Sequence, residues 1–260
     1  MKTIILCGGK GARLGEETNF LPKAMIKIGH RPIIWHILKR YSFNGFNDFI
    51  LALGEKGELI RDYFIKYDYY TNDVKIDLKN GKIENLTNHL ESDWKISLVD
   101  TGNFAMSGAR IQRCKNYLND EDVFMVSYSD CLANIDIKDL IDFHIHSKKI
   151  ATVTGVLPPY REGEFLVEKH LAMGFYENKE NKLQMKHYIN GGYMVFNKEI
   201  FSYLNSFNEC RLESDIFPKL IKDKQLAIYP HDKFWRWLDT ERDFNYLNDL
   251  AEKNKMCWLY

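Results

Sequence analysis

Short, mostly apolar segments alternate with amphipathic ones along the first half of the chain. Thr3–Cys7, Asp48–Leu53 and Val123–Tyr128 read as strands buried on both faces of a parallel sheet. Between the first two, the apolar side chains of 33–41 recur at helical spacing directly after Pro32, a residue suited to the first turn of a helix. The alternation predicts an α/β fold with a Rossmann-like mixed, mostly parallel sheet flanked by helices.

A β-rich segment at about 68–97 interrupts this alternation. Within it, Asn80-Gly81 follows alternating polar and apolar residues, a pattern typical of a hairpin. Further helices are predicted at 58–67, 109–117, 137–146 and 214–222, further strands at 95–99, at 151–157 and in the polar stretch up to about 196, and a turn at Pro230-His231. No repeat or low-complexity linker divides the chain, so we expect a single domain over 1–260 with β-rich insertions.

Composition and charge exclude several classes of protein. The 260 residues are 45% hydrophobic, enough for one sizeable core, and 36 basic residues balance 36 acidic ones. A nucleic-acid binder is usually basic, so no nucleic-acid partner is expected. The five cysteines never form a CxxC pair, and no apolar run approaches the roughly 20 residues of a membrane span. These features predict a cytoplasmic protein with reduced thiols and no membrane partner.

The run LCGGKGARL (6–14) directly follows the first predicted strand. Three glycines there allow the backbone N–H groups to turn toward an anion. Arg13 adds a forked cation, and Lys23, after Pro22, adds a point charge, so the pair can clamp a triphosphate. A glycine-rich turn with two solvated cations is the alternative, but the combination and spacing of these residues favour a phosphate site.

Two better-known phosphate motifs fit this run poorly. The P-loop needs Ser or Thr after its Gly-Lys pair, and here Lys10 is followed by Gly11. The dinucleotide fingerprint needs a third glycine where Leu14 stands. A nicotinamide-dependent oxidoreductase is therefore disfavoured.

Two aspartates follow apolar segments far apart in the chain. Asp130 ends the strand predicted at 123–128, and Asp239 follows the segment WRWL (235–238). Mg²⁺ favours one or two carboxylates together with phosphate oxygens and water, so two aspartates that converge would suit it. The alternatives are a loop or helix-cap role for Asp130 and a cap of the terminal helix for Asp239.

The run LCGGKGARL with LPKAM (21–25) resembles the signature of the sugar-phosphate nucleotidyltransferases. Further motifs, in order over nearly the whole chain, are similar to the glucose-1-phosphate cytidylyltransferase branch: GHRPIIWHI (29–37), LVDTG (98–102), YSD (128–130), NGGY (190–193) and LDTERD (238–243). The first motif is specific for the superfamily, whereas LVDTG and LDTERD point to the cytidylyl branch.

This resemblance implies a fold of the nucleotide-diphospho-sugar transferase type, with a nucleotide-binding part at about 1–135 and an acceptor-binding part at about 136–245. It implies Mg²⁺-dependent transfer of CMP from CTP to a sugar 1-phosphate, by default glucose 1-phosphate. Pyrophosphate is released, and the CDP-activated product serves surface polysaccharide biosynthesis. It also implies a homo-oligomer, for which residues 63–104 are a candidate contact.

The resemblance assigns roles to individual residues. Arg13 and Lys23 are the expected catalytic cations, and Asp130 and Asp239 the metal ligands. Arg110 could donate to O2 of cytosine, although a plain surface cation is the alternative. The expected nucleotide-binding residues are Leu6, Gly8, Gly9, Gly11, Arg13, Lys23, Thr101, Gly108, Arg110, Ser129 and Asp130.

The acceptor side departs from the family pattern. Where the family usually shows Glu-Lys-Pro, this chain has Glu177-Asn178-Lys179, so Asn178 replaces the lysine expected to grip the acceptor phosphate. The expected acceptor-binding residues are Gly163, Glu177, Lys179, Asn190 and Gly191. The departure leaves open a different sugar phosphate or a non-sugar phosphate as acceptor. A non-catalytic nucleotide-sensing module is a more remote alternative.

Three other features are interpreted as structural. His144 and His146 face different sides of a predicted helix, so they do not suggest a metal pair. Cys131 adjoins Asp130, but no histidine lies near it in the sequence to activate a thiol nucleophile. The aromatic run 67–70 fits packing or interface contacts better than a stacking platform.

Overall fold

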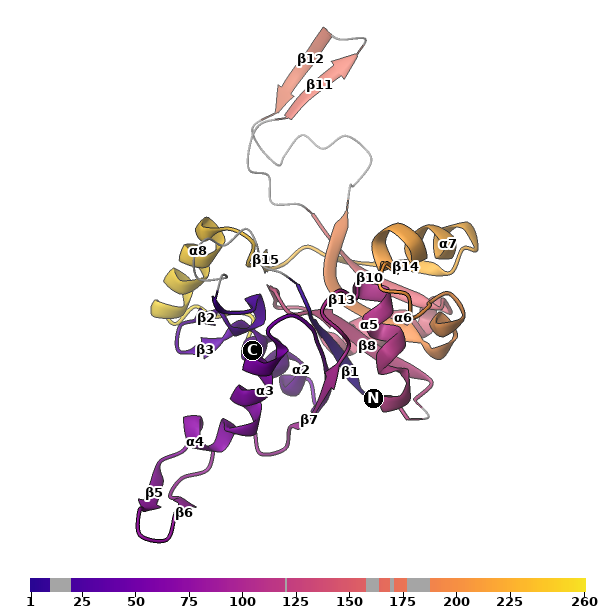
Figure 1. Ribbon diagram of the computed structural model, residues 1–260. Helices are drawn as coiled ribbons and strands as arrows, with labels where there is room; N and C mark the ends of the chain where they lie inside the picture. The colour runs from indigo at the N-terminus through magenta and orange to yellow at the C-terminus, as the bar shows by residue number, and fades with distance from the viewer. Residues whose placement is uncertain (10–19, 120, 158–163, 169–170, 177–187) are drawn as a thin grey trace.

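A computed structural model describes residues 1–9, 20–119, 121–157, 164–168, 171–176 and 188–260 (Figure 1). Its centre is a seven-stranded sheet in the order β14-β10-β13-β8-β1-β4-β7. The strands are β1 (Thr3–Cys7), β4 (Asp48–Leu53), β7 (Lys95–Asp100), β8 (Val123–Tyr128), β10 (Ala151–Val156), β13 (Ile189–Asn197) and β14 (Leu226–His231). All neighbouring pairs are parallel except those of β13, which is antiparallel to both β10 and β8. The mixed, mostly parallel sheet is confirmed.

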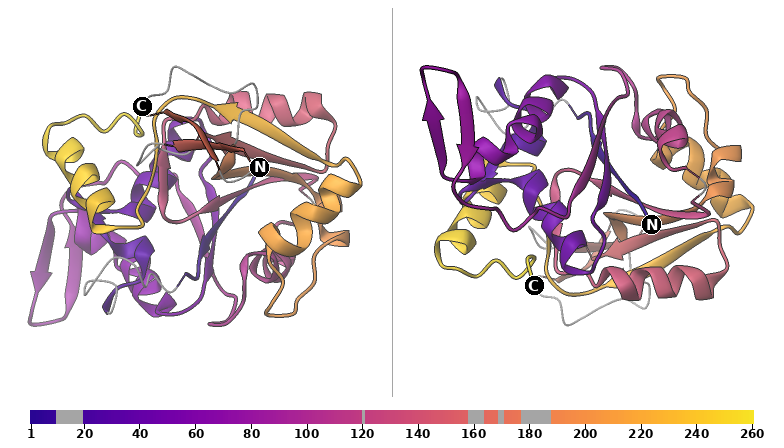
Figure 2. Two further views of the ribbon diagram at one scale, coloured as in Figure 1. Left: turned by 90° about the horizontal axis from the view of Figure 1, so that it is seen from above. Right: turned by 90° about the horizontal axis from the view of Figure 1, so that it is seen from below.

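Helices pack on both faces of this sheet. The α-helices are α2 (Ile33–Phe43), α3 (Gly57–Ile65), α4 (Tyr67–Thr71), α5 (Ser107–Cys114), α6 (Ile137–Ser147), α7 (Phe217–Lys222) and α8 (Glu241–Glu252). Alternate residues of β1 serve two cores: Ile5 and Cys7 pack with α2, α6 and α8, whereas Ile4 and Leu6 pack with α5 and α7. Figure 2 shows α6 and α7 on opposite sides of the strands. Burial on both faces explains why these strands are continuous apolar runs.

Shorter elements complete the chain. Two-stranded ribbons are β2 (Lys27–Ile28) with β3 (Arg31–Pro32), β5 (Val74–Asp77) with β6 (Lys82–Asn85), β9 (Cys131–Ala133) with β15 (Trp235–Trp237), and β11 (Glu164–Glu168) with β12 (Leu171–Tyr176). One-turn segments are η1 (Lys23–Met25), η2 (Lys115–Tyr117), η3 (Lys198–Ser202) and η4 (Leu212–Ile216), the last a π-type turn. Among the described residues, no helix combines the length and apolar character that crossing a bilayer requires.

Most of the predicted elements are present, and one prediction was wrong. Pro230 and His231 do not form a turn; they end β14, where they pair in parallel with Gly155 and Val156 of β10. β14 is an edge strand, and proline is tolerated there because its missing N–H costs no hydrogen bond on the open side. The sequence does not reveal that this segment is an edge strand, which is why the proline was interpreted as a turn.

The predicted β-rich excursion is an arm formed by α4, β5 and β6. Figures 1 and 2 show it extending from the end of α3, away from the sheet. The hairpin turns at the expected Asn80-Gly81, where Gly81 has φ +70°, and its apolar residues Ile76 and Leu78 are exposed. Such apolar residues gain nothing from the chain's own core, so this surface is suited to contact with another molecule.

His36 joins α2 to the C-terminal tail. The Trp258 indole N–H donates to His36 Nδ1 at 3.1 Å, and His36 Nε2 lies 2.9 Å from the carbonyl oxygen of Ile28. Because Nδ1 accepts, Nε2 carries the proton, and the ring is neutral. Burial lowers the pKa of His36 from 6.5 to about 4.

We expect acid to destabilise the fold through this histidine. Between about pH 6.5 and pH 4 the unfolded chain binds a proton that folded His36 does not, so the free energy of unfolding falls by an amount on the order of 3 kcal/mol as pH is lowered. Burial also lowers the pKa values of His144 and His231, which act in the same direction. Urea unfolding of wild type and His36→Gln at about pH 7.5 and about pH 5 measures this effect. Equal pH dependence in the two proteins would contradict the assignment to His36.

Candidate active site

Lys23 lies between the two aspartates that the sequence singles out. Its ammonium Nζ is 3.0 Å from Asp130 Oδ2 and 2.8 Å from Asp239 Oδ1. The Lys23 side chain is only 12% exposed, and the aspartates are 28% and 25% exposed. Lys23 is thus in direct contact with two carboxylates that lie more than 100 positions away in the chain. The sequence predicted that Lys23 and Arg13 meet these aspartates, and Arg13 lies outside the described residues.

The ribbon of β9 and β15 explains why the aspartates meet. Asp130 immediately precedes β9, and Asp239 follows β15 by two residues. These strands pair antiparallel with Trp237 opposite Cys131, and the Leu238 N–H donates to the Asp130 carbonyl at 2.8 Å. Because Thr240 caps α8 and Asp130 precedes a strand, neither aspartate serves as a helix cap.

The carboxylates determine the protonation of Lys23. Burial alone would lower the pKa of this lysine, but the charges of Asp130 and Asp239 and the hydrogen bonds to them outweigh burial and raise the pKa. Lys23 is therefore a permanent cation at neutral pH. The site holds a positive charge directly between two negative ones.

The same two carboxylates fit a divalent metal ion. Both direct an oxygen toward one cation, and two hard oxygen donors completed by phosphate and water are what Mg²⁺ prefers. Among the described residues, no group of three or more His, Cys, Asp or Glu side chains could hold a metal. A metal here would therefore depend on oxygens of a substrate as well as on the protein.

A cavity of about 200 Å³ lies beside this triad at the carboxyl ends of β1 and β8. In open α/β sheets, ligands bind at this end of the strands. Its lining includes the predicted residues Leu6, Gly8, Gly9, Lys23, Arg110, Ser129 and Asp130, together with Cys7, Ala24, Ala105, Met106, Ser107 and Tyr128. The sequence therefore predicted about half of this lining.

Arg110 forms the buried wall of this cavity. Its side chain extends from α5, and the residue is only 3% exposed, so the surface-cation alternative was wrong. Nη1 donates to Thr101 Oγ1 at 2.6 Å, to Leu53 O at 2.9 Å and to Gly102 O at 3.0 Å. The contact from Nη2 to Gly8 O is longer, 3.3 Å. The guanidinium is held rigidly by uncharged oxygens and keeps its positive charge free of any carboxylate among these contacts.

Gly8 gives the Arg110 guanidinium its space. A Cβ atom at Gly8 would lie 1.9 Å from Arg110 Cζ, whereas a Cβ at Gly9 would meet no atom within 4 Å. We expect Gly8→Ala to lower the free energy of unfolding by about 1–3 kcal/mol, because the guanidinium must leave its acceptors. Gly9→Ala is the matched control, with a change within about 0.5 kcal/mol. Equal denaturation midpoints for the two variants would contradict this role of Gly8.

A second cavity, of about 340 Å³, lies on the other side of Asp130. Its lining consists of Tyr128, Asp130, Asn190, Glu213, Trp237 and Asp239. Tyr128 and Asp130 also line the first cavity, so the two spaces meet at the triad. Asn190, predicted on the acceptor side, thus lines the same cavity as Asp130 and Asp239, the two predicted metal ligands.

Comparison with known proteins identifies the family of this chain. The family model described as nucleotidyl transferase matches residues 2–249. The chain belongs to the nucleotidyl transferase family. It is 38% identical to the glucose-1-phosphate cytidylyltransferases of Salmonella typhi and Salmonella typhimurium over 258 residues, covering 99% of this chain and 98% of each relative. The crystal structure of HddC from Yersinia pseudotuberculosis, complexed with GMP-PN, superimposes with a TM-score of 0.68 at 18% identity, over 96% of this chain and 99% of that chain.

The nucleotidyl transferase fold positions the remaining predicted residues in different ways. Thr101 is 1% exposed, and its hydroxyl oxygen accepts a hydrogen bond from the Arg110 guanidinium. Ser129 donates to the Leu6 carbonyl at 2.8 Å and so joins the ends of β8 and β1. A Cβ at Gly108 would meet Cys210 Sγ at 2.7 Å, so this glycine permits close packing of α5. Gly191 accepts from the Trp235 indole at 2.8 Å through its carbonyl. Gly11, Arg13, Gly163, Glu177 and Lys179 lie outside the described residues.

The interpretations of the other conspicuous residues hold in this nucleotidyl transferase. All five cysteines are free, and burial raises the pKa of Cys131 well above its usual value, so this thiol stays protonated and is a poor nucleophile. His144 contacts Thr152 and Asn197, whereas His146 lies against the Asp142 carbonyl, so they form no metal pair.

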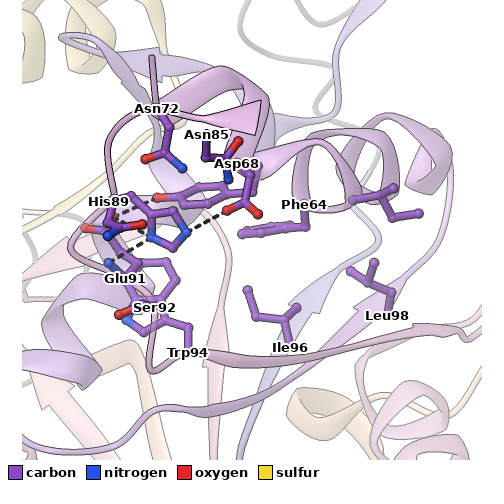
Figure 3. Close-up of a pocket in the computed structure, with 13 residues that line it drawn as sticks. Phe64, Asp68, Asn72, Asn85, His89, Glu91, Ser92, Trp94, Ile96 and Leu98 are labelled. Atoms are coloured by element: carbon purple, nitrogen blue, oxygen red, sulfur yellow. Dashed lines mark hydrogen bonds and ion pairs between the residues drawn. The ribbon is translucent and has the colours of Figure 1, made fainter. Parts of the chain in front are cut away.

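The first two residues of the aromatic run, Tyr67 and Asp68, line a separate cavity at the base of the arm. This space, of about 550 Å³, lies between the arm and β7 (Figure 3). The Tyr67 hydroxyl donates to Glu91 at 3.1 Å and accepts from the Trp35 indole at 2.9 Å, while His89 contacts Asp68 at 2.9 Å. Tyr69 and Tyr70 are exposed. Tyr67 is thus a packing residue and no open stacking surface.

Proposed function

We propose that this protein is a Mg²⁺-dependent cytidylyltransferase that transfers CMP from CTP to glucose 1-phosphate, releasing pyrophosphate and forming CDP-glucose. The observation that carries the proposal is Lys23 Nζ within 3.0 Å of both Asp130 and Asp239, at the point where two cavities meet. The 38% identity to glucose-1-phosphate cytidylyltransferases over nearly the full length supports CTP and this acceptor.

The chain's own residues suit a direct displacement. CTP would occupy the first cavity, with its base near Arg110 and its phosphates over Gly8 and Gly9. The acceptor's phosphate would enter from the second cavity and attack the α-phosphorus in line with the departing pyrophosphate. Catalysis then rests on positioning and on charge, and it needs no covalent enzyme intermediate.

Lys23 supplies the positive charge at this junction. When phosphates enter, its ammonium can contact them, because it already lies at the carboxylates that adjoin both cavities. Arg13, on the same glycine-rich loop, is proposed as a second cation for the triphosphate. Mg²⁺ held by Asp130 and Asp239 would supply Lewis-acid stabilisation of phosphate charge.

A matrix of nucleotides and acceptors tests this proposal. Purified protein is incubated with CTP, UTP, dTTP, GTP or ATP and with a panel of phosphorylated acceptors, and pyrophosphate release is measured with and without Mg²⁺. We expect turnover with CTP and glucose 1-phosphate to exceed every other combination. Pyrophosphate release with UTP, dTTP or GTP at an equal or higher rate would reject the cytidylyl assignment, and absence of release with all of them would reject the enzyme assignment.

A different acceptor is the second candidate. Asn178 stands where the family usually has the lysine that grips the acceptor phosphate, and this motivates another sugar phosphate or a non-sugar phosphate. The same matrix decides between them, because strong preference for glucose 1-phosphate would eliminate the alternative. A nucleotide-sensing module without catalysis is disfavoured by the intact Lys23, Asp130 and Asp239 cluster.

We also propose a homo-oligomer that uses the arm. Leu78, Leu86 and Leu90, on or beside the hairpin, are 90%, 60% and 85% exposed, which is unusual for leucine unless a surface is covered by another molecule. Light scattering of the purified protein measures its mass in solution, and a monomeric mass at micromolar concentration would reject this proposal.

A further inference from the structure

Glu213 is a polar residue of the second cavity to which the proposed reaction has given no role. It lies on η4, a single π-type turn, and π turns are frequent at functional sites. No motif in the sequence marks this position, and Glu213 lines the cavity together with Trp237 and Asn190. Within the described part of the chain Glu213 forms no salt bridge.

Two hydroxyl groups hold the Glu213 carboxylate in place. Ser107 Oγ donates to Oε2 at 3.0 Å, and the Tyr128 hydroxyl donates to Oε1. Ser107 Oγ in turn accepts from the Leu212 N–H at 2.9 Å, so its hydrogen is directed at Glu213. A phenol carries its proton near neutral pH, so the Tyr128 hydroxyl is the donor in its contact with Glu213. The carboxylate is therefore fixed before any ligand arrives.

A fixed carboxylate retains capacity for further hydrogen bonds. Its two oxygens offer about four lone-pair positions, of which Ser107 and Tyr128 occupy two. Glu213 is exposed, so the remaining positions are open to a ligand. The neighbouring Asn190 amide, which donates to Tyr128 at 3.3 Å, and the half-buried Trp237 ring complete a lining of polar groups and one aromatic surface.

The charge of the cavity determines which part of an acceptor lies at Glu213. Asp130 and Asp239 have Lys23 beside them and suit the phosphate end. Among the described residues no lysine or arginine lines this cavity at Glu213, so a phosphate there would be repelled by the carboxylate, whereas a neutral hydroxyl would donate to it favourably.

We propose that Glu213 is an acceptor-specificity residue that accepts a hydrogen bond from a hydroxyl group of the sugar ring. This inference rests on the proposed function, because it takes the second cavity as the acceptor pocket. It deepens that function by naming a residue that distinguishes a polyhydroxylated acceptor from one lacking a particular hydroxyl. Sites that pair with a substrate hydroxyl discriminate strongly against its absence.

The experiment compares wild type, Glu213→Gln and a matched control, Glu209→Gln. Glu209 is exposed four residues away and lies outside both cavities, so its variant removes the same charge nearby. We expect Glu213→Gln to lower kcat/KM for glucose 1-phosphate by about 10- to 100-fold, with the KM for CTP changed less than about 3-fold. Glu209→Gln should match wild type.

Monodeoxy analogues of glucose 1-phosphate then separate recognition from a structural role. For the analogue that lacks the contacted hydroxyl, the kcat/KM of wild type should fall by about 10-fold or more relative to glucose 1-phosphate. The kcat/KM of Glu213→Gln should be the same for this analogue and for glucose 1-phosphate. Thermal melting checks that the variant is folded. If the variant is unfolded, the measurements of wild type with the analogues still test whether the pocket recognises a sugar hydroxyl. Any of three results overturns the assignment. Glu213→Gln has the same kcat/KM as wild type with glucose 1-phosphate, every analogue lowers kcat/KM equally in both proteins, or no analogue lowers the kcat/KM of wild type.

Failure of the proposed function gives a different result. If wild type transfers CMP to no phosphorylated sugar, the proposed function is wrong, and the sugar assignment of Glu213 is overturned with it. If wild type is active and Glu213→Gln is unchanged, only the inference about Glu213 is overturned.

Discussion

Replacing Lys23 with alanine should lower turnover with CTP and glucose 1-phosphate by about 10²- to 10³-fold, a loss typical of removing one group that stabilises transition-state charge. In the folded protein this ammonium lies 3.0 Å and 2.8 Å from two carboxylates at the junction of the cavities. No other described cation lines either cavity near the aspartates except Arg110, whose donors are engaged with uncharged oxygens. Pyrophosphate release under saturating substrates measures the effect.

Lys27→Ala is the control for this variant. Lys27 is an exposed lysine four residues away, so its loss changes the net charge equally without touching the site. A second readout separates chemistry from folding: without Lys23, Asp130 and Asp239 repel each other, so the melting temperature should fall in the absence of metal and recover more with Mg²⁺ than in wild type. Turnover equal to that of Lys27→Ala would remove Lys23 from the mechanism.

The sequence predicted the central strands closely because their physical requirement is simple. β1, β4 and β8 are covered on both faces, so nearly every residue must be apolar, and the predicted bounds equal the observed ones. Pro230 in β14 could not be predicted in the same way. A strand can include a proline if that strand lies at the edge of the sheet. Which strand lies at the edge follows from the strand order, and the sequence pattern does not show that order.

Site residues could be predicted from the sequence where the proposed chemistry requires a particular residue type. Residues whose position depends only on tertiary contacts could not be predicted. Lys23, Asp130 and Asp239 were expected to converge because a metal-bound triphosphate needs both signs of charge. The β9–β15 ribbon that joins them is only three residues long on each side, too short to give a pattern. Glu213 was missed for a related reason: it lies on a one-turn element, and its partners Ser107 and Tyr128 are about 100 positions away.

Replacing Asp239 with asparagine should weaken binding of Mg²⁺ and lower turnover by about 10²- to 10³-fold. Asparagine keeps the shape of the side chain but removes half of the negative charge that Asp130 and Asp239 present together. Mg²⁺ prefers charged oxygen ligands, and among the described residues no group of three or more His, Cys, Asp or Glu side chains could hold a metal, so the lost charge is not compensated by a further ligand of these types. Turnover should therefore require higher Mg²⁺ concentrations before it saturates.

Binding of Mn²⁺ in the presence of CTP, measured by electron paramagnetic resonance, gives a readout independent of turnover. Asp232→Asn is the matched control, because Asp232 is exposed seven residues before Asp239 and outside both cavities. The fold should survive, since Thr240 and Asp243, not Asp239, form the capping box of α8. Lys23 loses one of its two carboxylate partners in this variant, so its ammonium should turn further toward Asp130 and compete with the metal for the remaining carboxylate. Unchanged Mn²⁺ affinity in Asp239→Asn would show that the metal is held elsewhere, and the two aspartates would then be partners of Lys23 alone.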